Sequence, residues 1–233
     1  MLFSTVSIAL QCGLTVQANV LLTDNFDGSS VDSTKWSVNT SIPGSSVSVS
    51  GGYLDLRNRG IITSIDNISG PFQIDGRFQL LNNERSNFHI EFRSSGFSGS
   101  TVGVQFQCRT DWNGYVDQIS IFDFTTSSPF WVNLTTPINL NSWYNFKIVD
   151  LTNKIDVYFN DSIAPVLSLN TRGSGGNKIV IYNREGSAAG SSISEGGVAR
   201  FDSINVSSVP EPSALSLLAV SLGGLALVRR RRS

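Results

Sequence analysis

The sequence contains few charged side chains, and its positive and negative charges nearly cancel. Of its 233 residues only 15% are charged, and the formal net charge is −1 at pH 7. A protein that binds nucleic acid normally presents a strongly basic face, because it must neutralise phosphates. Here the arginines Arg229–Arg232 stand together at the C-terminus, which leaves the part of the chain before them mildly acidic. The composition therefore excludes nucleic acid as a partner.

Cysteine and histidine are also scarce, since the chain has two cysteines and one histidine. These numbers exclude a disulfide framework and a zinc site built from clustered cysteines and histidines. There is also no Ser-His-Asp arrangement around the single histidine, and no glycine-rich loop of the kind that binds phosphates. Cys12 lies in the apolar N-terminal segment. Cys108 is in phase with Val104 and Phe106, so we expect a small buried hydrophobic residue there and not a nucleophile.

The middle of the chain lacks the Ala-, Leu- and Glu-rich stretches that form helices, and apolar and polar residues alternate there instead. The alternation is clearest over residues 72–80, 88–93 and 102–109. A period of two residues is typical of strands that have one buried face. With the turn clusters rich in glycine and serine, this pattern predicts an all-β, two-sheet sandwich over residues 19–208, with further strands at 116–124, 143–149, 155–159, 178–183 and 198–206.

Both ends of the chain differ from this body. Residues 1–18 are apolar from Leu2 to Leu14 and end in Val16-Gln17-Ala18. Small or β-branched residues at these positions suit cleavage by signal peptidase after Ala18, so residues 1–18 are predicted to be a signal peptide. The alternative is a buried N-terminal strand.

The C-terminal segment 209–233 begins with Val209-Pro210-Glu211-Pro212, which cannot continue a strand. The uncharged residues that follow predict a single transmembrane helix over about 213–228, and the basic tail 229–232 is expected to stay in the cytoplasm. This geometry places the body on the outer side of the membrane.

The order of Pro-Glu-Pro, short apolar helix and arginine cluster resembles the PEP-CTERM sorting signal of exported bacterial proteins. The resemblance implies that an exosortase recognises Pro210, Glu211 and Pro212, while the helix and Arg229, Arg230, Arg231 and Arg232 hold the segment at the membrane. The resemblance further implies that the protein is anchored in the inner membrane before processing, and that it lies at the cell surface or in the extracellular matrix afterwards. An ordinary tail anchor is the alternative.

The body resembles the concanavalin A-like lectin and glucanase domains in three segments, which are DNFDG at 24–28, GGYLDL at 51–56 and FDSINV at 201–206. The resemblance implies a jelly-roll sandwich of which one face commonly meets glycans. It also implies a structural calcium ion, for which Gly52 and Asp202 match the ligand positions and Asp24 is an added candidate. The alternative for Asp202 is a solvated turn residue.

Laminarinase-type members of that superfamily carry a Glu-x-Asp-x-x-Glu strand, and this spacing is missing from the chain. Retaining glycoside hydrolysis needs two carboxyl groups about 5–5.5 Å apart. Glu91 has only His89 and Arg93 as neighbours on the same face of its predicted strand, and Asp75 on another strand could complete a pair. We therefore expect a protein that is not an enzyme, with a glycoside hydrolase or lyase as the alternative.

The polar positions of three successive predicted strands would form one face if these strands are neighbours. Arginine suits the acidic groups of polysaccharides, so this face is a candidate glycan-binding site. Its residues are Arg77, His89, Glu91, Arg93, Gln105, Gln107 and Arg109, and aromatic residues in or beside turns, Trp112, Tyr115, Phe130 and Trp131, are candidates for stacking on sugars. The alternative is a solvated face with cross-strand ion pairs, and for the aromatic residues a role as caps of the sandwich edge.

These inferences predict an exported surface or matrix protein whose β-sandwich either binds glycans or is structural without a ligand. Signal peptidase and exosortase are the expected processing partners, and an extracellular polysaccharide is the expected ligand.

Overall fold

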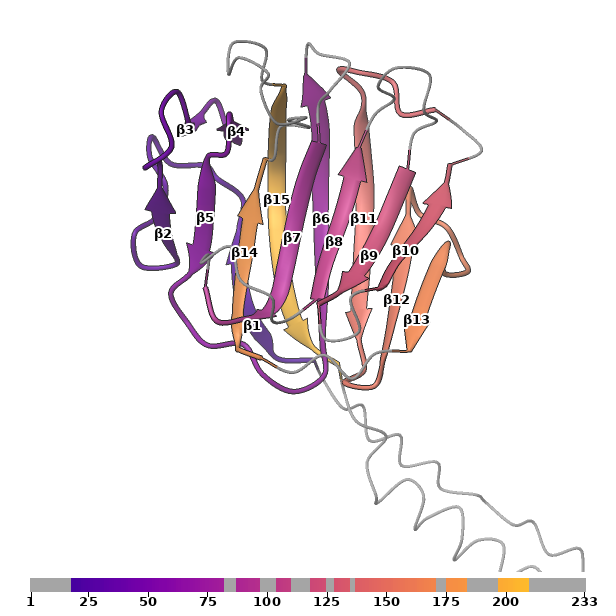
Figure 1. Ribbon diagram of the computed structural model, residues 1–233. Helices are drawn as coiled ribbons and strands as arrows, with labels where there is room; N and C mark the ends of the chain where they lie inside the picture. The colour runs from indigo at the N-terminus through magenta and orange to yellow at the C-terminus, as the bar shows by residue number, and fades with distance from the viewer. Residues whose placement is uncertain are drawn as a thin grey trace, which may run out of the picture. The chain divides into compact units, whose positions relative to one another are not determined.

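The alternating segments of the sequence form antiparallel strands in two sheets that pack face to face. A computed structural model describes residues 18–81, 87–96, 104–109, 118–124, 128–134, 137–170, 175–183 and 197–209. In Figure 1 the strands β7, β8 and β14 lie in front of β6, β11 and β15, so the two layers are seen one behind the other. The described residues contain fifteen strands and no helix. The predicted all-β sandwich is confirmed.

The first sheet has eight strands. β1 pairs with β15, outside the main path of the sheet. Along that path the order is β13 (Leu167–Asn170), β12 (Lys154–Phe159), β11 (Trp143–Asp150), β6 (Phe72–Leu81), β15 (Val198–Ser208), β4 (Tyr53–Arg57) and β3 (Ser46–Ser50), and β1 comprises Val20–Asp24.

The second sheet has seven strands, and it contains two of the three central segments that alternate most clearly in the sequence, β7 and β8. Its order is β10 (Ser128–Asn133), β9 (Gln118–Asp123), β8 (Val104–Arg109), β7 (Asn87–Ser94), β14 (Lys178–Tyr182), β5 (Ile61–Ser64) and β2 (Trp36–Asn39). β6 and β7 follow one another in the chain but belong to different sheets.

Aromatic rings from both sheets fill the space between the layers. Phe78 of β6 lies 4.6 Å from Phe88 of β7, and Phe88 lies 5.1 Å from Phe201 of β15, measured between ring centroids. Fully burying one such side chain stabilises a fold by about 1.5–3 kcal/mol. Cys108 is also fully buried in this cluster, as its phase in the strand predicted.

The sandwich is one compact unit, Asn19–Val209, and it includes both sheets and their core. Within the described part of the chain no helix has the length and apolar character needed to cross a membrane. The predicted membrane span at about 213–228 and residues 1–17 of the predicted signal peptide lie outside the described residues, as do Pro210, Glu211, Pro212 and Arg229–Arg232.

Gly76 lies at the centre of the eight-stranded sheet on its inner side. The backbone register places Gly76 opposite Phe146 on β11 and Ile204 on β15. A Cβ atom at this position would come within 2.4 Å of the Phe146 ring and 3.0 Å of Ile204. The Phe146 ring is itself packed against Phe88 at 5.8 Å and cannot retreat without disturbing the core.

We therefore predict that Gly76→Ala destabilises the protein by about 1–3 kcal/mol, because it overpacks the core. Replacing glycine by alanine at an unobstructed position normally stabilises a protein by about 0.4–1 kcal/mol, so the sign of the change is informative. Urea unfolding followed by tryptophan fluorescence measures it, with Ser48→Ala on the exposed side of β3 as the control. A midpoint for Gly76→Ala equal to or above that of the unmutated protein would contradict this packing.

Candidate functional site

The predicted polar face is assembled in part on the outer side of the seven-stranded sheet. β7 and β8 are neighbours, and their register aligns His89 with Gln107 and Glu91 with Gln105. The row through Gln107 continues onto β9 and β10, where it meets Ser120 and Trp131. Arg109 occupies the next outward position of β8, opposite Asn87. Trp112 and Tyr115 lie outside the described residues.

Tyr182 joins this face from β14, although the sequence alone did not single it out. Its ring stacks on His89 with 4.9 Å between centroids, and its hydroxyl donates a hydrogen bond to Glu91 Oε1 at 2.8 Å. His89 and Glu91 are only 2% and 8% exposed. The sequence predicted a strand over residues 178–183, but only strand pairing shows that β14 is the neighbour of β7. The three side chains form a buried polar cluster.

Arg93 does not lie on this face, although alternation along the strand predicted that position. Its backbone has a φ of 54°, which breaks the alternation of β7. The guanidinium reaches across to the other sheet, where Nε donates to Asp150 Oδ2 at 2.7 Å and NH2 donates to the Thr152 carbonyl at 2.8 Å. The side chains of Arg93 and Asp150 are 12% and 1% exposed. The two residues form a buried ion pair that links the layers.

We predict that Arg93→Ala destabilises the fold by about 3–5 kcal/mol, because it leaves the Asp150 carboxylate buried without its charged partner. Arg77→Ala serves as the control, since its exposed ion pair is worth at most about 1 kcal/mol. Chemical denaturation of both variants measures the difference in unfolding free energy. Equal losses in the two variants would mean that the cross-sheet pair has no special structural role.

Arg77 also lies away from the predicted face, because β6 belongs to the eight-stranded sheet. The condition for one continuous face, that the three polar strands are neighbours, is therefore met by β7 and β8 but not by β6. Arg77 NH1 lies 3.2 Å from Asp202 Oδ2, and the guanidinium lies 4.8 Å from the centre of the Trp143 ring. Asp75 is on β6 as well, so it cannot share a face with Glu91 as a second carboxylate.

The candidate calcium ligands are engaged by other groups. Asp24 accepts hydrogen bonds from the Trp36 Nε1–H at 2.9 Å and the Phe26 backbone N–H at 3.0 Å, and Asp202 pairs with Arg77. Gly52 has a φ of 82° in the two-residue turn between β3 and β4, a conformation that the hairpin itself requires. Within the described ranges no three acidic, histidine or cysteine side chains are grouped closely enough to hold a metal. These residues do not fit a calcium site.

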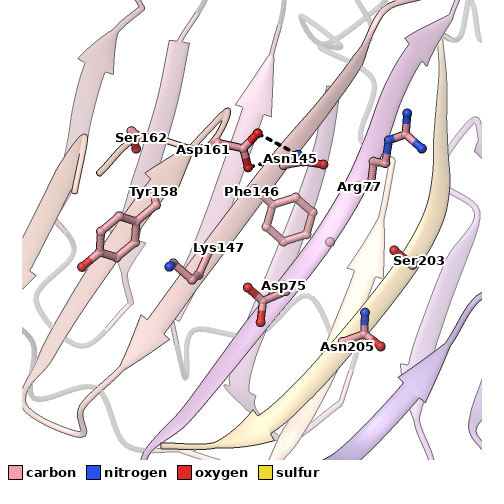
Figure 2. A pocket seen from close by; sticks show the side chains of 11 residues that line it. Asp75, Arg77, Asn145, Phe146, Lys147, Tyr158, Asp161, Ser162, Ser203 and Asn205 are labelled. Atoms are coloured by element: carbon pink, nitrogen blue, oxygen red, sulfur yellow. Dashed lines mark hydrogen bonds between the residues drawn. The ribbon is translucent and has the colours of Figure 1, made fainter. Parts of the chain in front are cut away.

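The outer face of the eight-stranded sheet carries a hollow with a volume of about 460 Å³. We call it the β6–β11 pocket. Figure 2 shows side chains from β6, β11, β12 and β15 around it. The register aligns Tyr158, Lys147, Asp75 and Asn205 in one row across four strands. The complete lining is Asp75, Gly76, Arg77, Asn145, Phe146, Lys147, Tyr158, Asp161, Ser162, Ser203 and Asn205.

Neighbouring groups hold the polar side chains of the pocket in place. Asn145 Nδ2 donates to both carboxylate oxygens of Asp161 at 3.1 Å, as the dashed lines in Figure 2 show. Gln73 Nε2 donates to Asp75 Oδ2 at 2.6 Å. The Lys147 ammonium lies 4.5 Å from the centre of the Tyr158 ring. The pocket thus presents both cationic and anionic groups in fixed positions.

A second group of side chains stands beside the pocket on the same face. Tyr53 and Trp143 have ring centroids 5.3 Å apart, and Arg200 lies 5.2 Å from the centre of the Tyr53 ring. Asp55 accepts two hydrogen bonds from Arg200, at 2.7 and 2.8 Å, and these bonds raise the pKa of the guanidinium above its ordinary value. The alternating polar positions of these strands were visible in the sequence, but their order in the sheet was not.

Comparison with known proteins identifies the C-terminal segment and the fold. Residues 208–232 match the PEP-CTERM protein-sorting motif. No curated protein sequence is detectably similar to the chain. The predicted resemblance of the tail is confirmed, and the motif indicates an exported protein.

Solved structures of glucanase type share the fold of the body. A glycosyl hydrolase family 16 protein from Mycobacterium smegmatis aligns with a TM-score of 0.60 and 13% identity, over 81% of this chain and 100% of that one. A β-glucanase from Bacillus licheniformis aligns at 0.59 and 12%, over 82% and 99% of the two chains. An immunostimulatory antigen of Mycobacterium tuberculosis, described as a pseudo β-1,3-glucanase, aligns at 0.62 and 14%, over 82% and 100%. At these identities the likeness establishes the fold alone.

Proposed function

We propose that this protein is exported, sorted to the cell surface or extracellular matrix, and binds glycans there without cleaving them. One observation supports the proposal that the protein does not cleave glycans. Glu91, the one carboxylate at the described outward positions of β7, β8 and β9, is buried and accepts a hydrogen bond from Tyr182. The positions aligned with it and next to it on β8 are Gln105 and Gln107, which are not acids.

Glycoside hydrolysis by the usual routes needs a pair of carboxyl groups, about 5–5.5 Å apart for retention and about 6.5–9.5 Å apart for inversion. Asp75 is in the other sheet and cannot supply the second group. A glutamine cannot act as a nucleophile or as a general acid in its place. The arrangement of β7, β8 and β9 therefore favours binding over hydrolysis.

The fold supports a carbohydrate as the ligand. The structures that share it include a β-glucanase and a protein described as a pseudo β-1,3-glucanase, and the latter description fits a body without the catalytic pair. A polysaccharide-active enzyme is the second candidate, because named glycoside hydrolases have the same fold.

The glycan-binding proposal is tested with the full chain in a mild detergent on a glycan array, and with release of reducing sugars from β-glucans and uronate polymers. We expect binding to one or more glycans and no turnover. Turnover that rises with enzyme concentration would favour the hydrolase or lyase, and a folded protein that neither binds nor cleaves would favour a structural role.

The sorting motif supports a defined route to the surface. In this proposal signal peptidase removes residues 1–18, the helix at about 213–228 anchors the chain in the inner membrane, and an exosortase acts at Pro210-Glu211-Pro212. The arginines at 229–232 then remain on the cytoplasmic side.

We predict that replacing Pro210, Glu211 and Pro212 together by alanine leaves the protein in the inner-membrane fraction with its arginine tail intact. The unmutated protein should appear in surface material, beginning near Asn19 and lacking that tail. Mass spectrometry of fractionated cells measures both forms, and Ser216→Ala within the apolar segment is the control. Equal surface delivery of the triple variant would contradict sorting through this motif.

A further inference from the structure

We infer that the β6–β11 pocket is the glycan-binding site and that it accepts an uncharged sugar unit. This inference rests on the proposed glycan-binding function and assigns it to the outer face of the eight-stranded sheet. The polar positions of β7 and β8, which the sequence favoured, lie on the other sheet, where His89 and Glu91 are buried. In the pocket, by contrast, Arg77 is nearly half exposed.

The size and composition of the pocket suit a small polar ligand. Its volume of about 460 Å³ lies within the range of about 300–1,000 Å³ that is typical of small-molecule sites. Most of the lining side chains carry hydrogen-bonding groups, and the Tyr158 ring provides an aromatic surface beside them. A sugar ring needs this combination, because it has many hydroxyl groups and a small apolar surface. A lipid chain would instead cover these polar groups without offering them hydrogen-bond partners.

The charges of the pocket give an anionic sugar no net attraction. Lys147 and Arg77 contribute positive charge, but the register places Lys147 directly opposite Asp75, and Asp161 adds a second carboxylate. Arg77 is in addition paired with Asp202 just outside the lining. A uronate or sulfate entering the pocket would therefore meet two carboxylates at close range. The two signs balance, which suits hydroxyl groups that both donate and accept.

The polar groups of the pocket have hydrogen-bonding capacity left for a ligand. A carboxylate can accept about four hydrogen bonds, and a lysine ammonium can donate three. Asp75 accepts one hydrogen bond, from Gln73. Among the described residues, the ion pairs formed within this sheet are those of Lys154, Arg200 and Arg77, and Lys147 is not one of their members. Asp75 and Lys147, adjacent in the register, can therefore bind neighbouring hydroxyl groups of one sugar ring.

The pocket is also preorganised, which lowers the entropic cost of binding. Asp161 is held by Asn145, Asp75 by Gln73, and Asn205 by a hydrogen bond from the Thr23 hydroxyl of β1. Arg77 is fixed between Asp202 and the Trp143 ring. These supports come from strands and not from the loops, so the lining is expected to keep its geometry when the ligand is absent.

The test compares Asp75→Asn and Lys147→Met with Lys154→Met, all in the full chain in detergent. Lys154 lies on the same sheet, at the start of β12, but it pairs with Asp156 and is not part of the lining. The probes are arrayed neutral oligosaccharides of glucose, galactose and mannose, together with uronate and sulfated oligosaccharides. We expect binding to a neutral probe that both pocket variants weaken about tenfold or more and that the control leaves unchanged. Thermal melts monitored by circular dichroism establish that each variant is folded.

Three results would overturn the inference in different ways. If the pocket variants are folded and bind neutral probes as the unmutated protein does, the pocket is not the site, although glycan binding itself stands. If only uronate or sulfated probes bind, the class of ligand is wrong. If no array probe binds and millimolar monosaccharides do not shift the side-chain amide NMR signals of Asn145 and Asn205, both the proposed function and this site fail. A shift of these signals that Asp75→Asn abolishes would support the site even when array binding is too weak to detect.

Discussion

Packing of apolar side chains between the two sheets is the constraint on which the other features of this protein depend. Phe78, Phe88 and Phe201 come from three different strands and both layers, and their rings contact one another in the centre. Because the inner positions of each strand are taken by this core, the alternate positions must face outward. Apart from the buried Arg93–Asp150 pair, the polar side chains discussed above therefore lie on the two outer faces, one on each sheet.

The two outer faces use their polar residues differently. On the seven-stranded sheet His89, Glu91 and Tyr182 are buried against one another, and Tyr182 stacks on His89 and donates a hydrogen bond to Glu91. On the eight-stranded sheet Lys147 and Asp75 line a hollow, and small side chains such as Ser203 leave space between the longer ones. Residues of similar type thus form a structural cluster on one face and the lining of a pocket on the other.

The arginines illustrate how backbone geometry decides the role of a side chain. Arg77 and Arg93 both occupy polar positions of alternating segments. Arg77 keeps the outward direction of its strand and forms an exposed pair with Asp202. Arg93 has a positive φ at the end of β7, and its guanidinium forms a buried pair with Asp150 of the opposite sheet. Buried pairs and exposed pairs differ greatly in their contribution to stability, because solvent screens only the latter.

The all-β class, the inward phase of residues such as Ile74 and Cys108, and the sorting motif at the C-terminus could be predicted from the sequence, because each depends on local periodicity or on a short contiguous pattern. The sequence could state a shared polar face only on the condition that its strands are neighbours, and pairing meets this condition for β7 and β8. The sequence did not reveal that β6 pairs with β11 and β15 and not with β7. This pairing, seen in the folded protein, is the reason that Asp75 and Arg77 line a pocket with Lys147 and Asn205. The order of strands in the sheet depends on pairing between segments far apart in the chain, such as β6 with β15. A period of two residues specifies which face of the sheet a side chain takes, but it does not specify which strand lies beside it.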